Sequence, residues 1–252
     1  MGILKITSES KALKRDQSFL LVLPKREQES LTVCYLLHGG GDDYTKWLRR
    51  TPLEQYANMY HVAFVLPEAG MSYYCDREDQ RFSTYIFSEL PAFLEQNFQF
   101  AAGQALIAGL SMGGYGSFKQ VLTKPTQYLA AGSFSGDLDI AQSRLSEDLF
   151  TAAWNEERYQ LIFGDKDQFD RSEENLYYLL AQKQELPFLY MSCGLSDPLL
   201  ENNQAFYEAA CKQTPITFET WAGAHDWQFW DESLRRFLQL AAEQGYVKEV
   251  GN

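Results

Sequence analysis

The chain is 252 residues long, 45% of its residues are hydrophobic, and its formal net charge is −12. This length and apolar fraction fit one large globular domain and exclude an intrinsically disordered chain. Nucleic acids and anionic membranes attract positive protein surfaces, so the negative charge disfavours both as partners.

The first ten residues carry no signal for export or lipid attachment. MGILKITSES lacks the basic start and apolar stretch of a secretory signal, and Ile6 spoils the myristoylation pattern. No segment is apolar for long enough to span a bilayer. The four cysteines form no CxxC pair, which disfavours a zinc site. We therefore expect a cytoplasmic protein with free thiols and no metal.

Seven apolar runs along the chain have the length of buried strands. Runs that are apolar on both faces are typical of parallel strands covered by helices on both sides. The runs are residues 18–23, 31–37, 61–67, 104–110, 128–136, 187–194 and 216–221.

Segments with a helical spacing of apolar residues fill the gaps between these runs. Residues 88–98 form one such segment, in which Pro91 marks the helix start or a kink. A second segment follows Ser111 directly. Near the end of the chain, a third segment predicts a helix with Asp231 as its N-cap and Gly245 past its C-terminus.

Strands that alternate with helices predict an α/β fold with a mostly parallel central sheet and helices on both faces. The stretch at about 137–186 is too long for one crossover, so we expect a small cap-like insertion there. No internal repeat or linker divides the chain. The expected organisation is one domain over residues 1–252.

The motif GxSxG occurs at Gly109–Gly113, where an apolar run ends and a helical segment begins. This strand–turn–helix setting is the one that a nucleophile elbow requires. The two glycines lack the side chains that would clash where strand and helix come close, and the helix N-terminus favours developing negative charge. Ser111 is therefore the predicted nucleophile.

A serine hydroxyl needs a base to accept its proton, and in elbow-type hydrolases the chain order is serine, acid, histidine. Of the three histidines, only His225 follows Ser111, which makes it the predicted base. Asp197 directly follows the run that precedes the histidine loop, and we favour it as the acid. Asp165 and Asp167, inside the expected insertion, are the alternatives.

Backbone N–H groups usually stabilise the negative charge that ester hydrolysis builds on the carbonyl oxygen. One predicted donor is Met112, the residue after the serine. The other is Gly40, with Gly41 as the near alternative, because glycine lets the backbone approach a substrate closely. His38, at the start of this glycine loop, is expected to pack behind the site rather than to catalyse.

Six motifs together resemble the esterase D-like family of α/β-hydrolases, which includes small bacterial tributyrin and acetyl esterases, S-formylglutathione hydrolases and feruloyl esterases. The similarity covers nearly the whole chain. The motifs are CYLLHGGGDDYTKWLRRT, AGLSMGGYGSFK, GSFSGDLD, LIFGDKDQFDRSEENLYYL, SCGLSDPLLENNQAF and GAHDWQFWDESLRRFL.

The resemblance implies an α/β-hydrolase fold and, position by position, a triad of Ser111, Asp197 and His225. Because this triad contains Asp197, the resemblance favours Asp197 over the two acids of the insertion. It also implies oxyanion donors at Gly40 and Met112. The family usually has bulkier residues within HGxxG than the glycines present here.

The implied activity is cofactor-free hydrolysis of short acyl esters of small molecules through an acyl-enzyme. Gly41 and Trp227 are candidate substrate contacts. Alternatives are acyl transfer to an alcohol, hydrolysis of a glutathione-type thioester, or a non-catalytic binding protein. The residues around Cys75 match the family only loosely, which weakens the thioester alternative. Relatives form dimers or tetramers, so the resemblance also implies a homo-oligomer.

Overall fold

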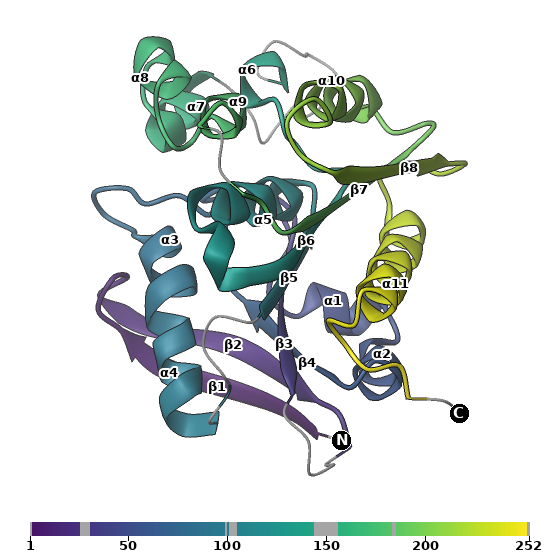
Figure 1. The fold of residues 1–252 in the computed structure, drawn as a ribbon. Helices are drawn as coiled ribbons and strands as arrows, with labels where there is room; N and C mark the ends of the chain where they lie inside the picture. The colour runs from purple at the N-terminus through teal and green to yellow at the C-terminus, as the bar shows by residue number, and fades with distance from the viewer. Residues whose placement is uncertain are drawn as a thin grey trace.

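Eight strands form one sheet in the order β1-β2-β4-β3-β5-β6-β7-β8 in the computed structural model, which describes residues 2–25, 31–98, 100, 105–143, 156–182 and 185–250 (Figure 1). The pairs β1–β2 and β2–β4 are antiparallel, and all other neighbours are parallel. The mostly parallel sheet predicted from the sequence is confirmed. The strands are β1 (Gly2–Ser10), β2 (Arg15–Leu23), β3 (Thr32–Leu37), β4 (Val62–Pro67), β5 (Ala105–Leu110), β6 (Tyr128–Phe134), β7 (Phe188–Gly194) and β8 (Ile216–Trp221).

Helices cover both faces of this sheet, so successive side chains of a central strand enter different cores. In β3, Val33 and Tyr35 belong to one apolar cluster, whereas Cys34 and Leu36 belong to the other. This explains why the strand has no polar alternation. The first cluster packs under five helices: α3 (Phe82–Thr84), α4 (Leu90–Phe98), α5 (Met112–Thr123), α9 (Leu176–Leu180) and α10 (Leu200–Ala210) (Figure 1). The second cluster packs under three helices on the other face: α1 (Lys46–Arg50), α2 (Leu53–Met59) and α11 (Trp227–Glu243).

The seven predicted runs coincide with β2 to β8, but β1 was not predicted. Its residues alternate between exposed and half-buried positions, so it has no continuous apolar run. Its place is decided by antiparallel pairing with β2 over its whole length, from Gly2 opposite Leu23 to Ser10 opposite Arg15. Such an edge strand is stabilised mainly by backbone hydrogen bonds to one neighbour, which leave little trace in composition.

The predicted N-cap of the last helix is wrong. Asp226 caps α11, because its side chain accepts a hydrogen bond of 3.0 Å from the backbone N–H of Phe229. Asp231 lies inside the helix and accepts a hydrogen bond from the Tyr56 hydroxyl at 2.9 Å. Gly245 does lie past the helix end, with a positive φ of 75°.

The helical segment around Pro91 starts earlier than its apolar spacing indicates. It begins with α3, continues through a π turn at Tyr85–Glu89 and ends with α4. Pro91 is the second residue of α4, so the ring follows directly after the π turn. A proline cannot donate the usual helical hydrogen bond, and a local change of helical winding accommodates this.

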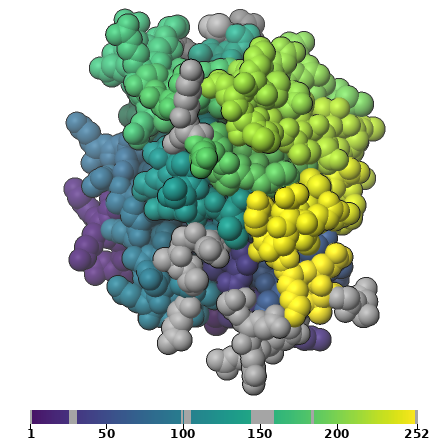
Figure 2. Space-filling model, in the orientation of Figure 1, coloured from purple at the N-terminus to yellow at the C-terminus, as the bar shows by residue number. Residues whose placement is uncertain are grey.

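The connection from β6 to β7 contains α6 (Ile140–Ser143), α7 (Glu156–Phe163), α8 (Lys166–Asp170) and α9. These helices occupy the stretch where we expected an insertion, of which residues 144–155 and 183–184 lie outside the described residues. Figure 2 shows this green part of the chain above the teal centre, and α9 packs on α5. Within the described residues, no helix has both the length and the apolar character needed to cross a bilayer.

Candidate active site

The predicted site residues follow strands whose carboxyl ends meet at one edge of the sheet. The strands β3, β5, β7 and β8 are parallel, so the loops after them open on the same side. Gly40 follows β3, Ser111 follows β5, Asp197 follows β7 and His225 follows β8.

Ser111 occupies the strained turn between β5 and α5. Its φ of 52° and ψ of −119° lie in a region that non-glycine residues rarely adopt. Close backbone contacts on both sides hold this turn. A Cβ on Gly109 would lie 2.5 Å from the carbonyl of Gly113, and a Cβ on Gly113 would lie 2.5 Å from the carbonyl oxygen of Leu37. Only glycine fits at these two positions, so the spacing of the motif follows from the geometry of the elbow.

His225 and Asp197 form a hydrogen-bonded pair, although 28 residues separate them in the chain. Nδ1 of His225 lies 3.0 Å from Oδ2 and 3.2 Å from Oδ1 of Asp197. The Asp197 side chain is fully buried, whereas the His225 side chain is 24% exposed. Because the carboxylate accepts the proton on Nδ1, the lone pair of Nε2 is left available to act as a base.

The pKa of Asp197 is lower than that of an ordinary aspartate. Burial alone would raise this pKa, but the hydrogen bond and the charge of His225 outweigh burial, with help from the backbone N–H of Leu199. The N–H of Leu199 donates to Oδ1 at 2.9 Å. Asp197 therefore stays ionised at neutral pH and holds the imidazole in one orientation.

Asp165, an alternative acid considered from the sequence, lies elsewhere. It is exposed and caps α8, where its carboxylate accepts a hydrogen bond of 2.9 Å from the N–H of Gln168. Asp167 is also exposed, in the first turn of α8. Within the part of the chain that the structure describes, no hydrogen bond joins the Ser111 hydroxyl to His225. Contacts of this kind often tighten only when substrate is bound.

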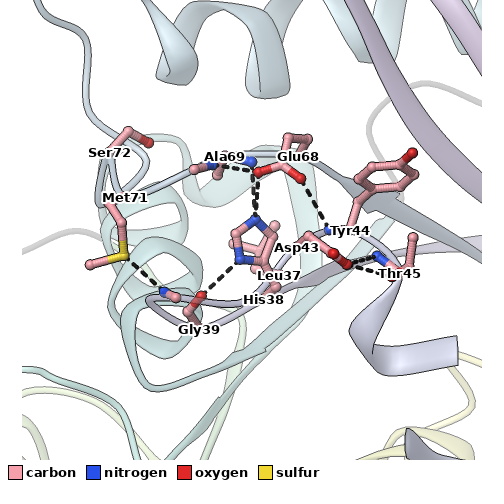
Figure 3. Close-up of polar contacts among 12 residues, drawn as sticks. Leu37, His38, Gly39, Asp43, Tyr44, Thr45, Glu68, Ala69, Met71 and Ser72 are labelled. Atoms are coloured by element: carbon pink, nitrogen blue, oxygen red, sulfur yellow. Dashed lines mark hydrogen bonds and ion pairs between the residues drawn. The ribbon is translucent and has the colours of Figure 1, made fainter. Parts of the chain in front are cut away.

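The glycine loop after β3 approaches the elbow closely. A Cβ on Gly39 would lie 3.5 Å from the Cβ of Ser111. Gly40 and Gly41 are both exposed, and Gly41 has a positive φ of 77°. Its N–H donates to the sulfur of Met71 at 2.8 Å, and Figure 3 shows the Met71 side chain directed toward this loop. The sequence had not singled out Met71, because nothing local connects it to a loop 30 residues earlier.

His38 supports the glycine loop from behind, as its position in the sequence predicted. Its ring is buried, with Nδ1 2.8 Å from the carbonyl oxygen of Gly39 and Nε2 3.0 Å from the backbone nitrogen of Ala69 (Figure 3). The first contact needs a proton on Nδ1 and the second needs a lone pair on Nε2. The two contacts together indicate the neutral Nδ1–H tautomer.

A second carboxylate near the elbow was not assigned a role from the sequence. The backbone N–H of Asp137 donates to the carbonyl oxygen of Ser111 at 3.3 Å. Its buried side chain accepts hydrogen bonds from the hydroxyls of Tyr73 at 2.8 Å and Ser143 at 2.5 Å. Burial raises the pKa of Asp137 above the ordinary value, although these hydrogen bonds and the nearby His225 oppose the shift. In the sequence, Asp137 was marked only by its place in the motif GSFSGDLD, three residues past the end of β6.

Aromatic side chains pack on one side of the histidine. The ring of Trp230 meets the His225 ring edge to face, with centroids 4.9 Å apart. Trp227 lies partly exposed between Trp47 and Trp230, at centroid distances of 5.1 and 5.3 Å. Trp227 thus belongs to the packing around the start of α11, and its contact with substrate stays a prediction.

The sequence matches a known family over most of its length. The Esterase family model matches residues 10–240. An acetyl esterase of Caldicellulosiruptor saccharolyticus is 29% identical over 254 residues, which cover 93% of this chain and 96% of that protein.

Solved structures of serine hydrolases share the fold. FphF, a fluorophosphonate-binding serine hydrolase of Staphylococcus aureus, superposes with a TM-score of 0.85 and 26% identity, covering 95% of this chain and 97% of that one. The S-formylglutathione hydrolase FrmB of the same organism gives a TM-score of 0.83 and 27% identity, with 95% and 98% coverage. This chain therefore belongs to the Esterase family and is a serine esterase with the α/β-hydrolase fold.

Proposed function

We propose that this esterase hydrolyses short-chain acyl esters through an acyl-enzyme formed on Ser111, with His225 as base and Asp197 as acid. The observation that carries the proposal is the His225–Asp197 hydrogen bond of 3.0 Å at the edge of the sheet where Ser111 sits in a strained elbow. The relative named acetyl esterase supports a small acyl group.

In the proposed first half of the reaction, Nε2 of His225 accepts the Ser111 proton while Oγ attacks the ester carbonyl. The tetrahedral intermediate then collapses, and the imidazolium gives its proton to the departing alcohol. In the second half, the same base activates water, which attacks the acyl-enzyme and releases the acid. Ionised Asp197 stabilises the imidazolium in both halves.

The proposed oxyanion donors are the backbone N–H groups of Met112 and Gly40. Met112 is the first residue of α5, so its N–H has no acceptor within the helix and lies at the positive end of the helix dipole. Gly41, the alternative donor, already donates to the Met71 sulfur. This contact favours Gly40 as the second donor.

The direct test is hydrolysis of p-nitrophenyl acetate, butyrate and octanoate by the wild type and by Ser111→Ala. We expect turnover of the two short esters, a much smaller kcat/KM for octanoate, and loss of all activity in the variant. Octanoate turnover equal to that of acetate would contradict the short-acyl assignment. Absence of turnover with all three esters would contradict the proposed hydrolysis.

Adding an alcohol acceptor to the same assay separates hydrolysis from acyl transfer. If the acyl group appears mainly on the alcohol rather than as free acid, the enzyme is an acyltransferase that uses the same triad. Release of thiol from an acyl thioester tests the third activity, which the likeness to FrmB suggests.

The pH profile of kcat/KM tests the proposed base. An imidazole accepts a proton only when it is neutral, so activity should rise with pH as the base loses its proton. The pKa of Asp197 is lowered, so this carboxylate is already ionised at neutral pH and adds no second step near it. We expect a single acid limb with a slope of one in p-nitrophenyl acetate hydrolysis. A flat profile, or a slope of two, would contradict these roles.

A further inference from the structure

A cavity of about 320 Å³ lies beside the glycine loop, on the side occupied by Met71. The triad residues take no part in its walls. Arg15, at the start of β2, and Leu161, on α7, both line it, although they are far apart in the sequence. Its walls include Arg15, Glu68, Met71, Arg77, Phe82 and Leu161.

Short contacts connect this cavity to the nucleophile. Met71 forms part of the wall and accepts the N–H of Gly41 through its sulfur at 2.8 Å. A Cβ on Gly40 would lie 3.3 Å from the Met71 sulfur, and a Cβ on Gly39 would lie 3.5 Å from the Cβ of Ser111. The glycine loop and one thioether therefore separate the cavity from the serine.

Met71 has the properties of a movable barrier. Its side chain is unbranched, is only partly buried, and directs its sulfur toward the loop (Figure 3). A thioether is a weak hydrogen-bond acceptor, so little free energy is lost when the contact with Gly41 breaks. Met71 is therefore the side chain that stands between this cavity and the glycine loop next to Ser111.

The arginines in the wall have few strong partners. The Nε of Arg77 is buried and has no hydrogen-bond partner among the described residues, and its Nη2 lies 3.4 Å from the exposed carboxylate of Asp79. The Arg15 guanidinium lies over the ring of Phe82 at 5.7 Å and donates from Nε to Gln17 at 3.2 Å. Both side chains retain donors for a ligand.

Among the described residues that line the cavity, Glu68 is the one carboxylate, and other groups of the protein already bind it. Glu68 accepts hydrogen bonds from the N–H groups of Gly70 at 2.7 Å and Tyr44 at 3.3 Å, and it lies 3.5 Å from Nε2 of His38 (Figure 3). The two guanidinium groups outnumber it, so the cavity favours an anion. Phe82, Met71 and Leu161 supply apolar contacts for the rest of the ligand.

We propose that this cavity receives the alcohol part of the ester, that Met71 gates it, and that Arg15 and Arg77 bind a carboxylate on that alcohol. The inference rests on the proposed function, since it needs an ester held at Ser111. The preferred substrates are then short acyl esters of hydroxy acids, such as hydroxybenzoates.

A matched pair of aryl acetates tests the charge preference. The probe is 4-acetoxybenzoate, and 4-acetoxybenzamide is its neutral counterpart of nearly equal shape. We expect Arg77→Gln and Arg15→Gln each to lower kcat/KM for the benzoate about tenfold, the typical effect of losing one charge-assisted hydrogen bond. Hydrolysis of the benzamide should change less than about twofold. Arg171→Gln, an exposed arginine after α8, is the matched control.

The gate is tested with the same esters and with methyl acetate. Met71→Ala should raise kcat/KM for both aryl esters relative to methyl acetate, because the shorter side chain opens the passage. Met59→Ala, at the end of α2, is the control. Unchanged thermal unfolding shows that each variant is folded.

An unchanged benzoate-to-benzamide ratio in both arginine variants would overturn the carboxylate assignment, and an unchanged preference in Met71→Ala would overturn the gate. Hydrolysis of p-nitrophenyl acetate by the same samples distinguishes failure of this inference from failure of the proposed function. If the wild type hydrolyses that ester while the ratios stay constant, only this inference fails. If the wild type does not hydrolyse it, the proposed function fails as well.

Discussion

Ser111→Ala should lower kcat for p-nitrophenyl acetate by about 10⁶-fold, as loss of the nucleophile does in other Ser-His-Asp hydrolases. In the proposed mechanism the variant loses the atom that forms the acyl-enzyme, which leaves only substrate binding and oxyanion stabilisation. A fluorophosphonate should label the wild type once and leave the variant unlabelled in intact mass spectrometry. Turnover and labelling thus test independently whether the Ser111 hydroxyl oxygen is the nucleophile.

The variant should keep its fold. Ser111 is almost fully buried and its strained backbone is imposed by the contacts of Gly109 and Gly113, which alanine does not disturb. We therefore expect a thermal unfolding midpoint close to that of the wild type. Ser88→Ala, at an exposed serine, is the matched control and should keep full activity and labelling. If Ser111→Ala fails to fold, or keeps its activity, Ser111 is a structural turn residue instead.

Asp197→Asn should lower kcat by about 10⁴-fold, with little change in KM, by analogy with the same substitution in other triads. The asparagine can still accept the N–H of Leu199, so the loop geometry should survive. However, it cannot stabilise an imidazolium, and it favours the wrong tautomer of His225. The loss should therefore appear in the chemical step rather than in substrate binding.

The control for this prediction is Asp165→Asn. Asp165 caps α8 from an exposed position, and asparagine caps helices about as well as aspartate. Activity and stability should both stay close to the wild type. If Asp165→Asn lost more activity than Asp197→Asn, the acid would be assigned to the wrong residue.

Much of the fold could be predicted because its signals are local. Six of the strands, β2 to β7, contain short apolar runs that are buried on both faces between two layers of helices, whereas the edge strand β8 is only half-buried. The nucleophile motif is local as well. Its two glycines are required by backbone contacts of 2.5 Å within one strand–turn–helix unit. Only one histidine follows Ser111, so chain order alone selected His225.

Features that depend on contacts between distant segments needed the tertiary structure. The edge strand β1 is defined by its pairing with β2. The N-cap of α11 is Asp226 rather than Asp231, because the helix begins at Trp227 in the folded chain. From residue types alone, Asp197 and Asp165 were both open, and only the folded chain brings one of them to His225.

By itself, then, the sequence determined seven of the eight strands, the elbow and the order of its catalytic candidates, because burial and backbone sterics act on neighbouring residues. Tertiary structure alone decided that Met71 covers the glycine loop, that Asp137 lies beside the elbow, and that Arg15 and Arg77 share one cavity. Met71, Arg77 and Asp137 follow the parallel strands β4 and β6, whose carboxyl ends lie at one edge of the sheet, and Arg15 reaches the same edge as the first residue of β2, which runs antiparallel to β4. No periodicity along the chain indicates that these residues meet.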